Sequence, residues 1–341
     1  MKKITATLVC SLLLAQSPVY AAEQLYLYNW TDYTSPELIK KFEAETGIEV
    51  VLDTYDSNET LLAKLKSGGG NYDIIVPSHN FVSILVEEEL LQPVNISNMK
   101  SFSNINSQWK NPPWDAGNRY TVPWQLGSTA FTVNTDVYSG DINSYKVLFT
   151  PPPELQGEIG MFNSSDEVVG MALAYLGYPT CSEDNAQMKE VRDLLIAQKP
   201  HVKVYNSDGI KDRLVSGETH MHMNWNGYSI RAREEIPALQ YAYPREGLIT
   251  WVDNLAVPKG AQNPENAKKF IEFFMHPENA ALQSNFAGYD SGNKNAVTYL
   301  DEDKKTAPEL NVPEGQKLVF SESCSQAALA LRDKVWTEIK K

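Results

Sequence analysis

The sequence predicts an α/β protein whose N-terminal part contains a parallel β-sheet. Three observations predict this class. Segments with strand-like alternation and segments with helix-like spacing of apolar residues follow each other from Gln24 onward. The links between them are short, and residues that start or stop helices stand at their borders. A β-α-β-α-β succession with short links is typical of parallel strands, and ligands of such sheets bind at the carboxyl ends of the strands.

The first predicted strand covers Gln24 to Asn29, where apolar and polar residues alternate. A helix is expected to start at Ser35-Pro36, because proline in the first turn needs no amide partner. Gly47 is a natural end for this helix, since glycine adopts the left-handed conformation of helix ends. Ile48 to Leu52 is rich in β-branched residues and predicts the second strand.

A second helix is predicted from Asn58, and Gly68-Gly69-Gly70 ends it. Tyr72 to Val76 is the third predicted strand. The turn after the first strand is Trp30-Thr31-Asp32-Tyr33, and the turn after the third is Pro77-Ser78-His79-Asn80. Because parallel strands end at the same edge, both turns are expected to lie at one site.

A second α/β region is predicted after the first, with one strand of the chain crossing into it near Thr132-Val133 and another crossing back. The elements predicted around this region are a strand over Thr129 to Val133, a helix over Glu167 to Leu176 and a strand over Thr219 to Trp225. The strand that crosses back is predicted over Thr250 to Val257. Two helices are expected after it, one from Asn263-Pro264 and a final one near Gln326 to Lys340.

Residues 1–21 are predicted to be a signal peptide, so that the mature chain begins at Ala22. Lys2 and Lys3 form its basic start, and the apolar run from Ile4 to Leu14 is too short to span a bilayer. Val9 stands before Cys10 where a lipoprotein signal has a small residue. The expected product is therefore an exported protein without a lipid anchor.

The charge of the chain argues against two classes of partner. The net charge of −13 becomes −15 once the two lysines of the leader are removed. Nucleic acids and anionic membrane surfaces both favour basic patches, so neither is an expected partner. An acidic surface suits a cationic ligand, but it equally well serves solubility.

Two cysteines remain in the mature chain, Cys181 and Cys324. An oxidising compartment permits a bridge between them, but the sequence does not show that they lie close together. Their pairing stays open at this point.

Two distant segments place an indole beside a carboxylate where a strand is predicted to end. They are Trp30-Thr31-Asp32-Tyr33 and Trp251-Val252-Asp253. An aromatic face attracts an organic ammonium and a carboxylate supplies the full opposite charge. The pair of segments therefore favours capture of a cation, although both tryptophans could instead be packing residues of the core.

The acids of this proposed site have structural alternatives of different strength. Asp253 lies in an otherwise apolar strand with no Lys or Arg within five residues, so an external cation is its expected partner. Asp32 could be a local turn residue. Glu167 follows Ser164 by three residues before an apolar helix, which is the pattern of a capping box as well as of a binding acid.

No motif for catalysis, metal or cofactor binding is evident. His220-Met221-His222 places two imidazoles on one strand face, but no third ligand is near, so no metal is expected. The chain lacks the Gly-x-Ser-x-Gly and His-Glu-x-x-His motifs. A secreted glycosidase that uses paired carboxylates is the one enzyme class retained as an alternative.

The chain resembles the periplasmic spermidine/putrescine-binding proteins of ABC transporters over nearly its whole mature length. The blocks that carry the resemblance, in order, are Tyr28-Asn29-Trp30-Thr31-Asp32-Tyr33, Phe42 with Thr46-Gly47-Ile48 and Val50, Tyr55 with Ser57-Asn58-Glu59, Asp73-Ile74-Ile75-Val76-Pro77-Ser78, Trp225-Asn226-Gly227, Pro244 with Glu246-Gly247, Trp251-Val252-Asp253-Asn254-Leu255-Ala256-Val257-Pro258, and Gly288-Tyr289.

The resemblance implies a two-lobe periplasmic binding protein fold, with two crossing hinge strands and a ligand cleft between the lobes. It implies lobe 1 over residues 22–132 and 253–297, and lobe 2 over residues 133–252 and 298–341. It also implies a ligand-binding site made of Trp30, Thr31, Asp32, Tyr33, Ser78, Glu167, Trp225, Trp251, Asp253 and Tyr289.

The chain departs from the family pattern at one end of the implied cleft. Ser164 stands where the family tends to carry an acid, with Asp166 displaced by two positions. Asn80 replaces an aromatic residue, and the stretch Pro123-Trp124-Gln125-Leu126 also differs from its relatives. Glu322 lies near an expected polar contact and could supply a replacement acid. The amine class stands, while the length and number of amines of the ligand are open.

The function expected from the sequence is thus a periplasmic, non-enzymatic receptor for polyamines such as spermidine or putrescine. As a monomer it would deliver its ligand to the membrane permease of an ABC importer. The alternatives are a polyamine sensor that docks on a membrane signalling protein and the secreted glycosidase.

Overall fold

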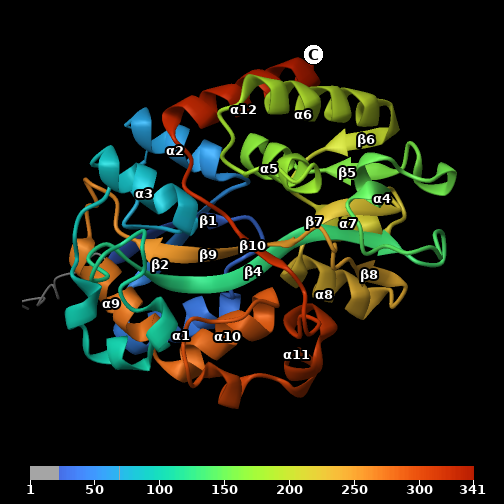
Figure 1. Ribbon diagram of the computed structural model, residues 1–341. Coiled ribbons are helices and arrows are strands. Elements are labelled where there is room, and N and C mark those ends of the chain that lie inside the picture. Colours follow the sequence, from blue (N-terminus) through green and yellow to red (C-terminus); the bar gives the residue numbers. More distant parts are fainter. Residues whose placement is uncertain (1–22, 69) are drawn as a thin grey trace, which may run out of the picture.

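The structure, a computed structural model, describes residues 23–68 and 70–341 and consists of two α/β lobes joined by long crossing strands (Figure 1). The predicted signal peptide, residues 1–21, lies outside the described residues. The strands form one hydrogen-bonded path in the order β2-β1-β3-β9-β4-β7-β5-β6, with β10 beside β9 and β8 beside β4.

The sheet of the first lobe contains the predicted parallel strands. β1 (Gln24–Trp30) lies between β2 (Glu49–Tyr55) and β3 (Ile74–Ile75) and pairs with both in parallel. The turns after β1 and β3 therefore meet at one edge, as the sequence predicts. The helices of this lobe are α1 (Pro36–Thr46), α2 (Asn58–Lys66), α3 (His79–Glu87), α9 (Pro264–Phe274) and α10 (Pro277–Ala287).

Local sequence explains where these helices begin and end. The Ser35 side chain accepts a hydrogen bond from the amide of Leu38, and Gly47 closes α1 with a φ of 71°. Helices cover both faces of the sheet: α2 and α3 lie on one side, and α1, α9 and α10 on the other (Figure 1).

The two lobes are joined by β4 (Thr121–Asn134) and β9 (Leu248–Ala256), which run antiparallel to each other. The sequence predicted only Thr129 to Val133 of β4 as a strand. The first part of β4 contains Pro123, and proline is unusual in a central strand. The structure accommodates this proline at a shift of the strand register between Pro123 and Gln125.

The second lobe continues the sheet from β4. Its strands are β5 (Ile159–Met161), β6 (Val202–Tyr205), β7 (Met221–Trp225) and β8 (Leu239–Tyr241), and β5 is parallel to both β6 and β7. Its helices are α4 (Lys146–Phe149), α5 (Ser165–Tyr175), α6 (Asn185–Gln198), α7 (Ile210–Val215) and α8 (Asn226–Glu235).

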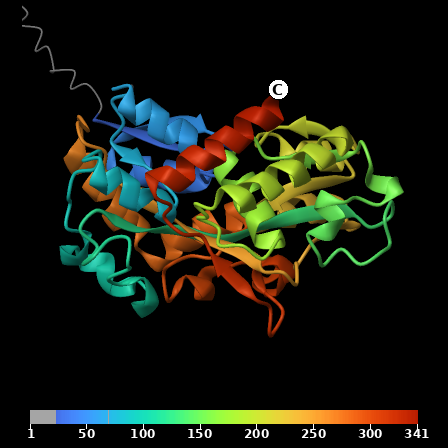
Figure 2. The same cartoon turned by 45° about the horizontal axis from the view of Figure 1, so that its top comes forward.

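The C-terminal segment returns to the second lobe. After α11 (Glu302–Thr306), β10 (Leu318–Phe320) pairs with β9, and α12 (Gln326–Lys340) packs against α5 and α6. The turned view shows α12 running along the second lobe with its N-terminal end directed toward the first (Figure 2). The lobe boundaries after residues 132 and 252 stay a prediction, because β4 and β9 pass through them without a break.

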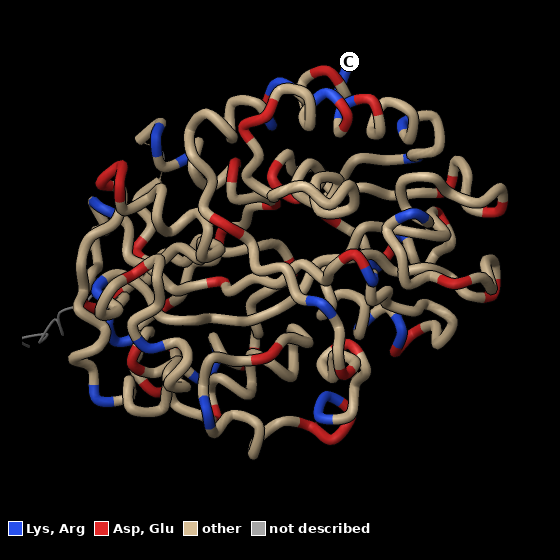
Figure 3. The backbone as a smooth tube through the Cα atoms, viewed as in Figure 1, with Lys and Arg blue, Asp and Glu red and all other residues tan. Residues whose placement is uncertain are grey.

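Charged residues surround the strands that connect the lobes. Lys and Arg are spread over the outer helices and loops, whereas β4 and β9 contain none (Figure 3). Within the described part of the chain, no helix combines the length and the apolar character needed to cross a membrane.

Cys181 and Cys324 form a disulfide, which answers the question that the sequence left open. The bond joins a loop after α5 to the residue before the Ser325 cap of α12. It therefore ties the last helix of the chain to the second lobe.

Replacing Cys181 and Cys324 together by serine is expected to lower the free energy of unfolding by about 2–5 kcal/mol. The cross-link closes a loop with a sequence separation of 143 residues, and long loops lose most chain entropy in the unfolded state. Urea unfolding of the oxidised protein and the double variant measures the change. Reduced wild type is the control and should match the variant; an unchanged midpoint would contradict the prediction.

Candidate ligand-binding site

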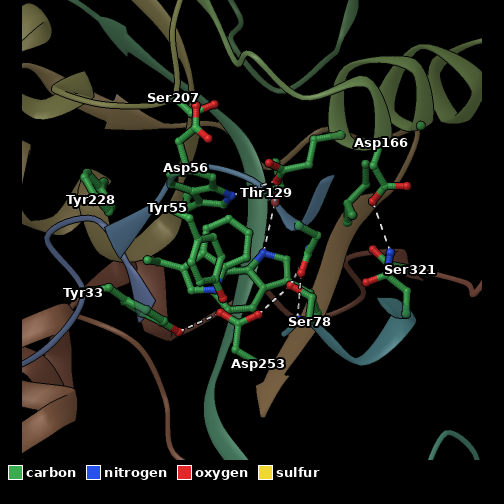
Figure 4. A pocket seen from close by; sticks show the side chains of 18 of the residues that line it. Tyr33, Tyr55, Asp56, Ser78, Thr129, Asp166, Ser207, Tyr228, Asp253 and Ser321 are labelled. Carbon is green, nitrogen blue, oxygen red and sulfur yellow. Dashed lines mark hydrogen bonds between the residues drawn. The ribbon is translucent and has the colours of Figure 1, made fainter. Parts of the chain in front are cut away.

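A cleft of about 890 Å³, counted with its solvent-open mouth, lies between the lobes (Figure 4). Nine of the ten site residues expected from the sequence line it. They come from both lobes and from the crossing strands: Trp30, Thr31, Tyr33, Ser78, Glu167, Trp225, Trp251, Asp253 and Tyr289.

Asp32 is the expected site residue that the structure places elsewhere. It is exposed, it does not line the cleft, and its backbone adopts a φ of 51°. Aspartate tolerates this left-handed conformation in turns, so the local-turn alternative explains the residue. The expectation that Asp32 contacts the ligand is corrected accordingly.

Asp253 of β9 is a buried carboxylate whose hydrogen bonds come from neutral groups. The Ser78 hydroxyl donates to one oxygen at 2.6 Å and the Tyr33 hydroxyl to the other at 3.0 Å. Figure 4 shows Tyr33 and Ser78 converging on Asp253. Burial raises the pKa of Asp253 to about 7, against the two hydrogen bonds, which lower it. Among the described residues, no Lys or Arg forms an ion pair with it.

Glu167 is the second acid of the cleft; the structure shows one half of the predicted capping box, and its role as a binding acid stays a prediction. Its backbone amide donates to the Ser164 hydroxyl at 3.3 Å, which is the first half of a capping box. Its carboxylate accepts from the Trp225 indole at 2.8 Å and from Thr129 at 3.2 Å. The cap uses the amide, so the side chain remains available to the cleft.

The electrostatic environment of Glu167 disfavours its charged form. Burial is the largest cause that raises the pKa of Glu167 to about 8, and the nearby acids Glu59 and Asp253 raise it further. The cleft thus contains two acids, Glu167 and Asp253, that form no ion pair within the described part of the chain.

The tryptophans are held by their ring edges, which leaves ring faces available to a guest. The Trp30 indole donates to the carbonyl of Val76 at 2.9 Å, and the Trp251 indole donates to Thr129 at 3.0 Å. Gly127 permits the position of Trp251, because a Cβ there would meet the indole at 2.4 Å. The two separate tryptophan–acid segments of the sequence therefore converge on one cleft, as predicted.

Further aromatic rings complete this wall. The ring centroids of Trp30 and Trp225 lie 6.1 Å apart, those of Trp251 and Tyr289 5.3 Å apart, and those of Tyr33 and Tyr289 5.3 Å apart. The Trp30–Trp225 and Tyr33–Tyr289 pairs are edge-to-face and the Trp251–Tyr289 pair is tilted, and such contacts fix ring orientation. Tyr289 directly follows Gly288, the C-cap of α10, so a helix-ending turn carries it into the site.

The sequence missed several residues of the lining. Tyr55 and Tyr228 are aromatic, and Tyr228 donates to the carbonyl of Thr31 at 2.6 Å, which joins the two lobes across the cleft. The block Trp225-Asn226-Gly227 is adjacent to Tyr228 and was the available signal. The other missed residues are Asp56, Asn58, Thr129, Gly170, Thr180, Ser207, Asp208, Ile249, Ser321 and Arg332.

The end of the cleft at α5 differs most from what the sequence suggested. Asp166 forms an ion pair with Arg332 of α12, a residue that no nearby motif marks. Asn80 of α3 donates to the other oxygen of Asp166 at 3.1 Å, so this contact also crosses the lobes. The expected replacement acid Glu322 lines the cleft as well, but it is exposed.

Ser164, the residue at the position of a family acid, faces away from the ligand space. Its hydroxyl donates to the Glu59 carboxylate of α2 at 3.1 Å. Glu59 also accepts from Ser165 at 3.1 Å and from the Asp166 amide at 2.9 Å. A carboxylate of the first lobe thus caps the N-terminus of α5 in the second, a position where negative charge is favoured.

One histidine of the His220-Met221-His222 run, His222, has a packing explanation, whereas His220 is partly exposed and its Nδ1 has no hydrogen-bond partner among the described residues. His222 is fully buried, its Nδ1 lies 2.7 Å from the carbonyl of Met223, and Gly160 leaves room for its ring. Burial lowers the pKa of His222 to about 3, so the ring is neutral. Within residues 23–68 and 70–341, no group of three potential metal ligands is present.

Two lobes, two crossing strands and an aromatic cleft with unpaired acids define a receptor for a small solute. Sequence comparison places the chain within this class: residues 37–312 match the family described as "Bacterial extracellular solute-binding protein". The chain belongs to this family of bacterial extracellular solute-binding proteins.

Individual relatives agree with this assignment. The "Spermidine/putrescine-binding periplasmic protein" of Salmonella typhimurium is 36% identical over 299 residues, which cover 86% of this chain and 85% of the relative. The "Putrescine/cadaverine-binding protein" of Pseudomonas aeruginosa is 30% identical and covers 100% of this chain and 99% of its own length. A "Putative spermidine/putrescine ABC transporter" structure from Listeria monocytogenes superimposes with a TM-score of 0.88, at 31% identity, covering 94% of this chain and 99% of the other.

Proposed function

We propose that this protein is a periplasmic receptor that binds a linear polyamine in the cleft between its lobes. The observation that carries the proposal is Asp253: a buried carboxylate with no positive partner among the described residues, at the centre of an aromatic cleft. Leaving such a charge unpaired is costly, and an organic ammonium is the partner that both the acid and the rings favour. The names of the Salmonella and Pseudomonas relatives support the same ligand class.

In this proposal the ligand lies along the cleft with its methylene chain against the rings of Trp30, Trp225 and Trp251. One ammonium group pairs with Asp253 and another with Glu167. Each cation–π contact contributes about 0.5–2 kcal/mol, depending on how dry the contact is. Closure of the lobes encloses both charge pairs, so the ligand favours the closed form because it binds that form more tightly.

The proposed partner is the membrane permease of an ABC importer, with the closed receptor as the form that docks. The name of the Listeria relative, "Putative spermidine/putrescine ABC transporter", supports this partner. Uptake of a labelled polyamine by cells with and without this chain tests it. Uptake that depends on the chain supports import, whereas unchanged uptake would instead favour the polyamine sensor that acts on a membrane signalling protein.

Ligand binding itself is tested by a thermal-shift panel of putrescine, cadaverine, norspermidine, spermidine and spermine. A ligand that binds only the folded state raises its melting temperature, by an amount equivalent to about 2.7 kcal/mol at a hundred times Kd. At least one amine is expected to do so. The matched control is 1,4-butanediol, which has the methylene chain of putrescine without its charges. No shift with any amine, or an equal shift with the diol, would refute the proposal.

A further inference from the structure

One end of the cleft already contains a cation that belongs to the protein. Among the described residues that line the cleft, Arg332 is the only basic one. Its side chain is 4% exposed and forms an ion pair with Asp166. The guanidinium gives Asp166 the positive charge and hydrogen-bond donors that a ligand ammonium would give to an unpaired acid.

The position of Arg332 is fixed by the surrounding chain. Besides the pair with Asp166, its other terminal nitrogen donates to the carbonyl of Thr180 at 2.5 Å. Thr180 precedes Cys181, whose disulfide holds the start of α12, the helix that carries Arg332. Burial lowers the pKa of Arg332 only to about 10, so the group stays charged at neutral pH.

Asp166 has little remaining capacity to bind a ligand. One of its oxygens pairs with Arg332, and the other accepts from Asn80 at 3.1 Å. Asn80 stands where the sequence comparison expected an aromatic residue, and Ser164 stands where it expected an acid. Both departures thus serve contacts within the protein: Asn80 holds Asp166, and Ser164 binds Glu59.

The other acids of the lining fall into two groups. Asp253 and Glu167 form no ion pair among the described residues, and burial raises the pKa of both carboxyls. Asp56 and Asp208 are partly exposed and Glu322 is exposed, although one carboxylate oxygen of Asp208 is buried without a hydrogen-bond partner among the described residues. An ammonium beside an exposed acid keeps most of its hydration, so such a pair contributes little to affinity.

We propose that Arg332 is a specificity-determining residue: a resident cation that neutralises Asp166 and closes this end of the cleft to ligand ammonium groups. The inference rests on the proposed function and narrows its ligand class. The cleft accommodates two ammonium groups, at Asp253 and Glu167, and a third nitrogen directed toward Asp166 meets the guanidinium. The site therefore prefers diamines, such as putrescine and cadaverine, over spermidine and spermine.

The test compares titration calorimetry of putrescine and spermidine on wild type and on Arg332→Gln. Wild type is expected to bind putrescine more tightly. In Arg332→Gln the Asp166 carboxylate is released, so the ratio of spermidine to putrescine affinity is expected to rise by about tenfold or more, as for a newly paired charge in a partly buried site. Arg332→Lys, which keeps the positive charge, is expected to retain the wild-type preference.

Two further variants separate this effect from general damage to the fold. Arg332→Gln combined with Asp166→Asn removes both charges and should restore the wild-type ratio, because no carboxylate of the cleft lining is released; Glu59 and Asp333, the other acids near Arg332, lie outside the lining. Arg233→Gln breaks the ion pair with Glu309, which lies outside the cleft lining, and should leave the ratio unchanged. Melting temperatures without ligand identify any variant that fails to fold.

The outcomes distinguish this inference from the proposed function. Tighter binding of spermidine than putrescine by wild type, or an unchanged ratio in folded Arg332→Gln, overturns the role of Arg332 and leaves polyamine binding intact. If Arg332→Gln does not fold, the inference is still tested by the preference of wild type for putrescine over spermidine and by whether Arg332→Lys keeps that preference. No binding of any amine by wild type overturns the proposed function itself.

Discussion

Asp253→Asn is expected to weaken the binding of a diamine by about 3–5 kcal/mol, which is roughly a hundredfold to a few thousandfold in Kd. The substitution leaves the ligand ammonium in the closed cleft without its carboxylate. Asparagine has nearly the same shape and can still accept hydrogen bonds from Ser78 or Tyr33. The expected loss therefore reports the missing charge and not a collapse of the wall.

The same substitution should not destabilise the ligand-free protein. Burial raises the pKa of Asp253 to about 7, which means that the folded state disfavours its charge at neutral pH. Asp253→Asn removes that unpaired charge, so the melting temperature without ligand is expected to stay equal or rise while affinity falls. A change of the two quantities in opposite directions is typical of a binding residue and not of a structural one.

Asp73→Asn is the matched control for a buried acid. Asp73 is fully buried and accepts from the amides of Tyr26 and Asn263, but it does not line the cleft. Its substitution should lower stability and leave Kd within a few-fold of wild type. Among single aromatic truncations only Trp251→Ala is expected to approach the loss caused by Asp253→Asn, because it also opens the wall beside Tyr289. Near-native affinity in both Asp253→Asn and Trp251→Ala would remove this site from consideration.

Local signals in the sequence predicted the elements that carry the site. Ser35, Pro36 and Gly47 specify the limits of α1 through capping and backbone conformation, and the structure agrees with each. The alternation of strands and helices correctly placed the turns after β1 and β3 at one edge. These features depend on neighbours in the chain, which is why they can be read from it.

The end of the cleft at α5 could not be predicted because it depends on contacts between distant residues. Arg332 pairs with an acid 166 positions earlier, and no motif marks Arg332 itself. Glu59 caps a helix of the opposite lobe, so its role appears only when the lobes are together. Asp32 is the converse case: a plausible acid beside a tryptophan is exposed, lies in a turn with a left-handed backbone conformation and does not line the cleft.

Polyamine affinity is expected to fall by about two orders of magnitude or more between pH 8 and pH 6. The pKa of Glu167 is raised to about 8 and that of Asp253 to about 7 in the ligand-free cleft. Each must lose its proton to pair with an ammonium, whose own pKa lies near the lysine value of about 10.4. Below pH 7 both acids are protonated, so binding must release protons and becomes weaker with each unit of acidification.

As pH rises, the stability of the ligand-free protein is expected to fall while its affinity for the polyamine increases. Both acids have folded-state pKa values above their ordinary ones, so the ligand-free protein loses stability from these groups as pH rises from about 4 through 7 and 8. Ligand binding removes this cost, because the ammonium stabilises the charged carboxylates. The thermal shift produced by a saturating diamine is therefore expected to be larger at pH 8 than at pH 6.

Titration calorimetry at pH 6, 7 and 8, in buffers with different ionisation enthalpies, measures affinity and released protons together. The release should be largest near pH 6 and should decline toward pH 8. Glu167→Gln is the informative variant: it should nearly flatten the dependence between pH 7 and pH 8, and below pH 7 it should leave only the one-proton dependence of Asp253. Affinity that is constant with pH, or binding without proton release at pH 6, would show that these two carboxylates do not hold the ligand. That result would also separate their role from that of the aromatic wall, since the attraction of a ring face for an ammonium does not change over this range.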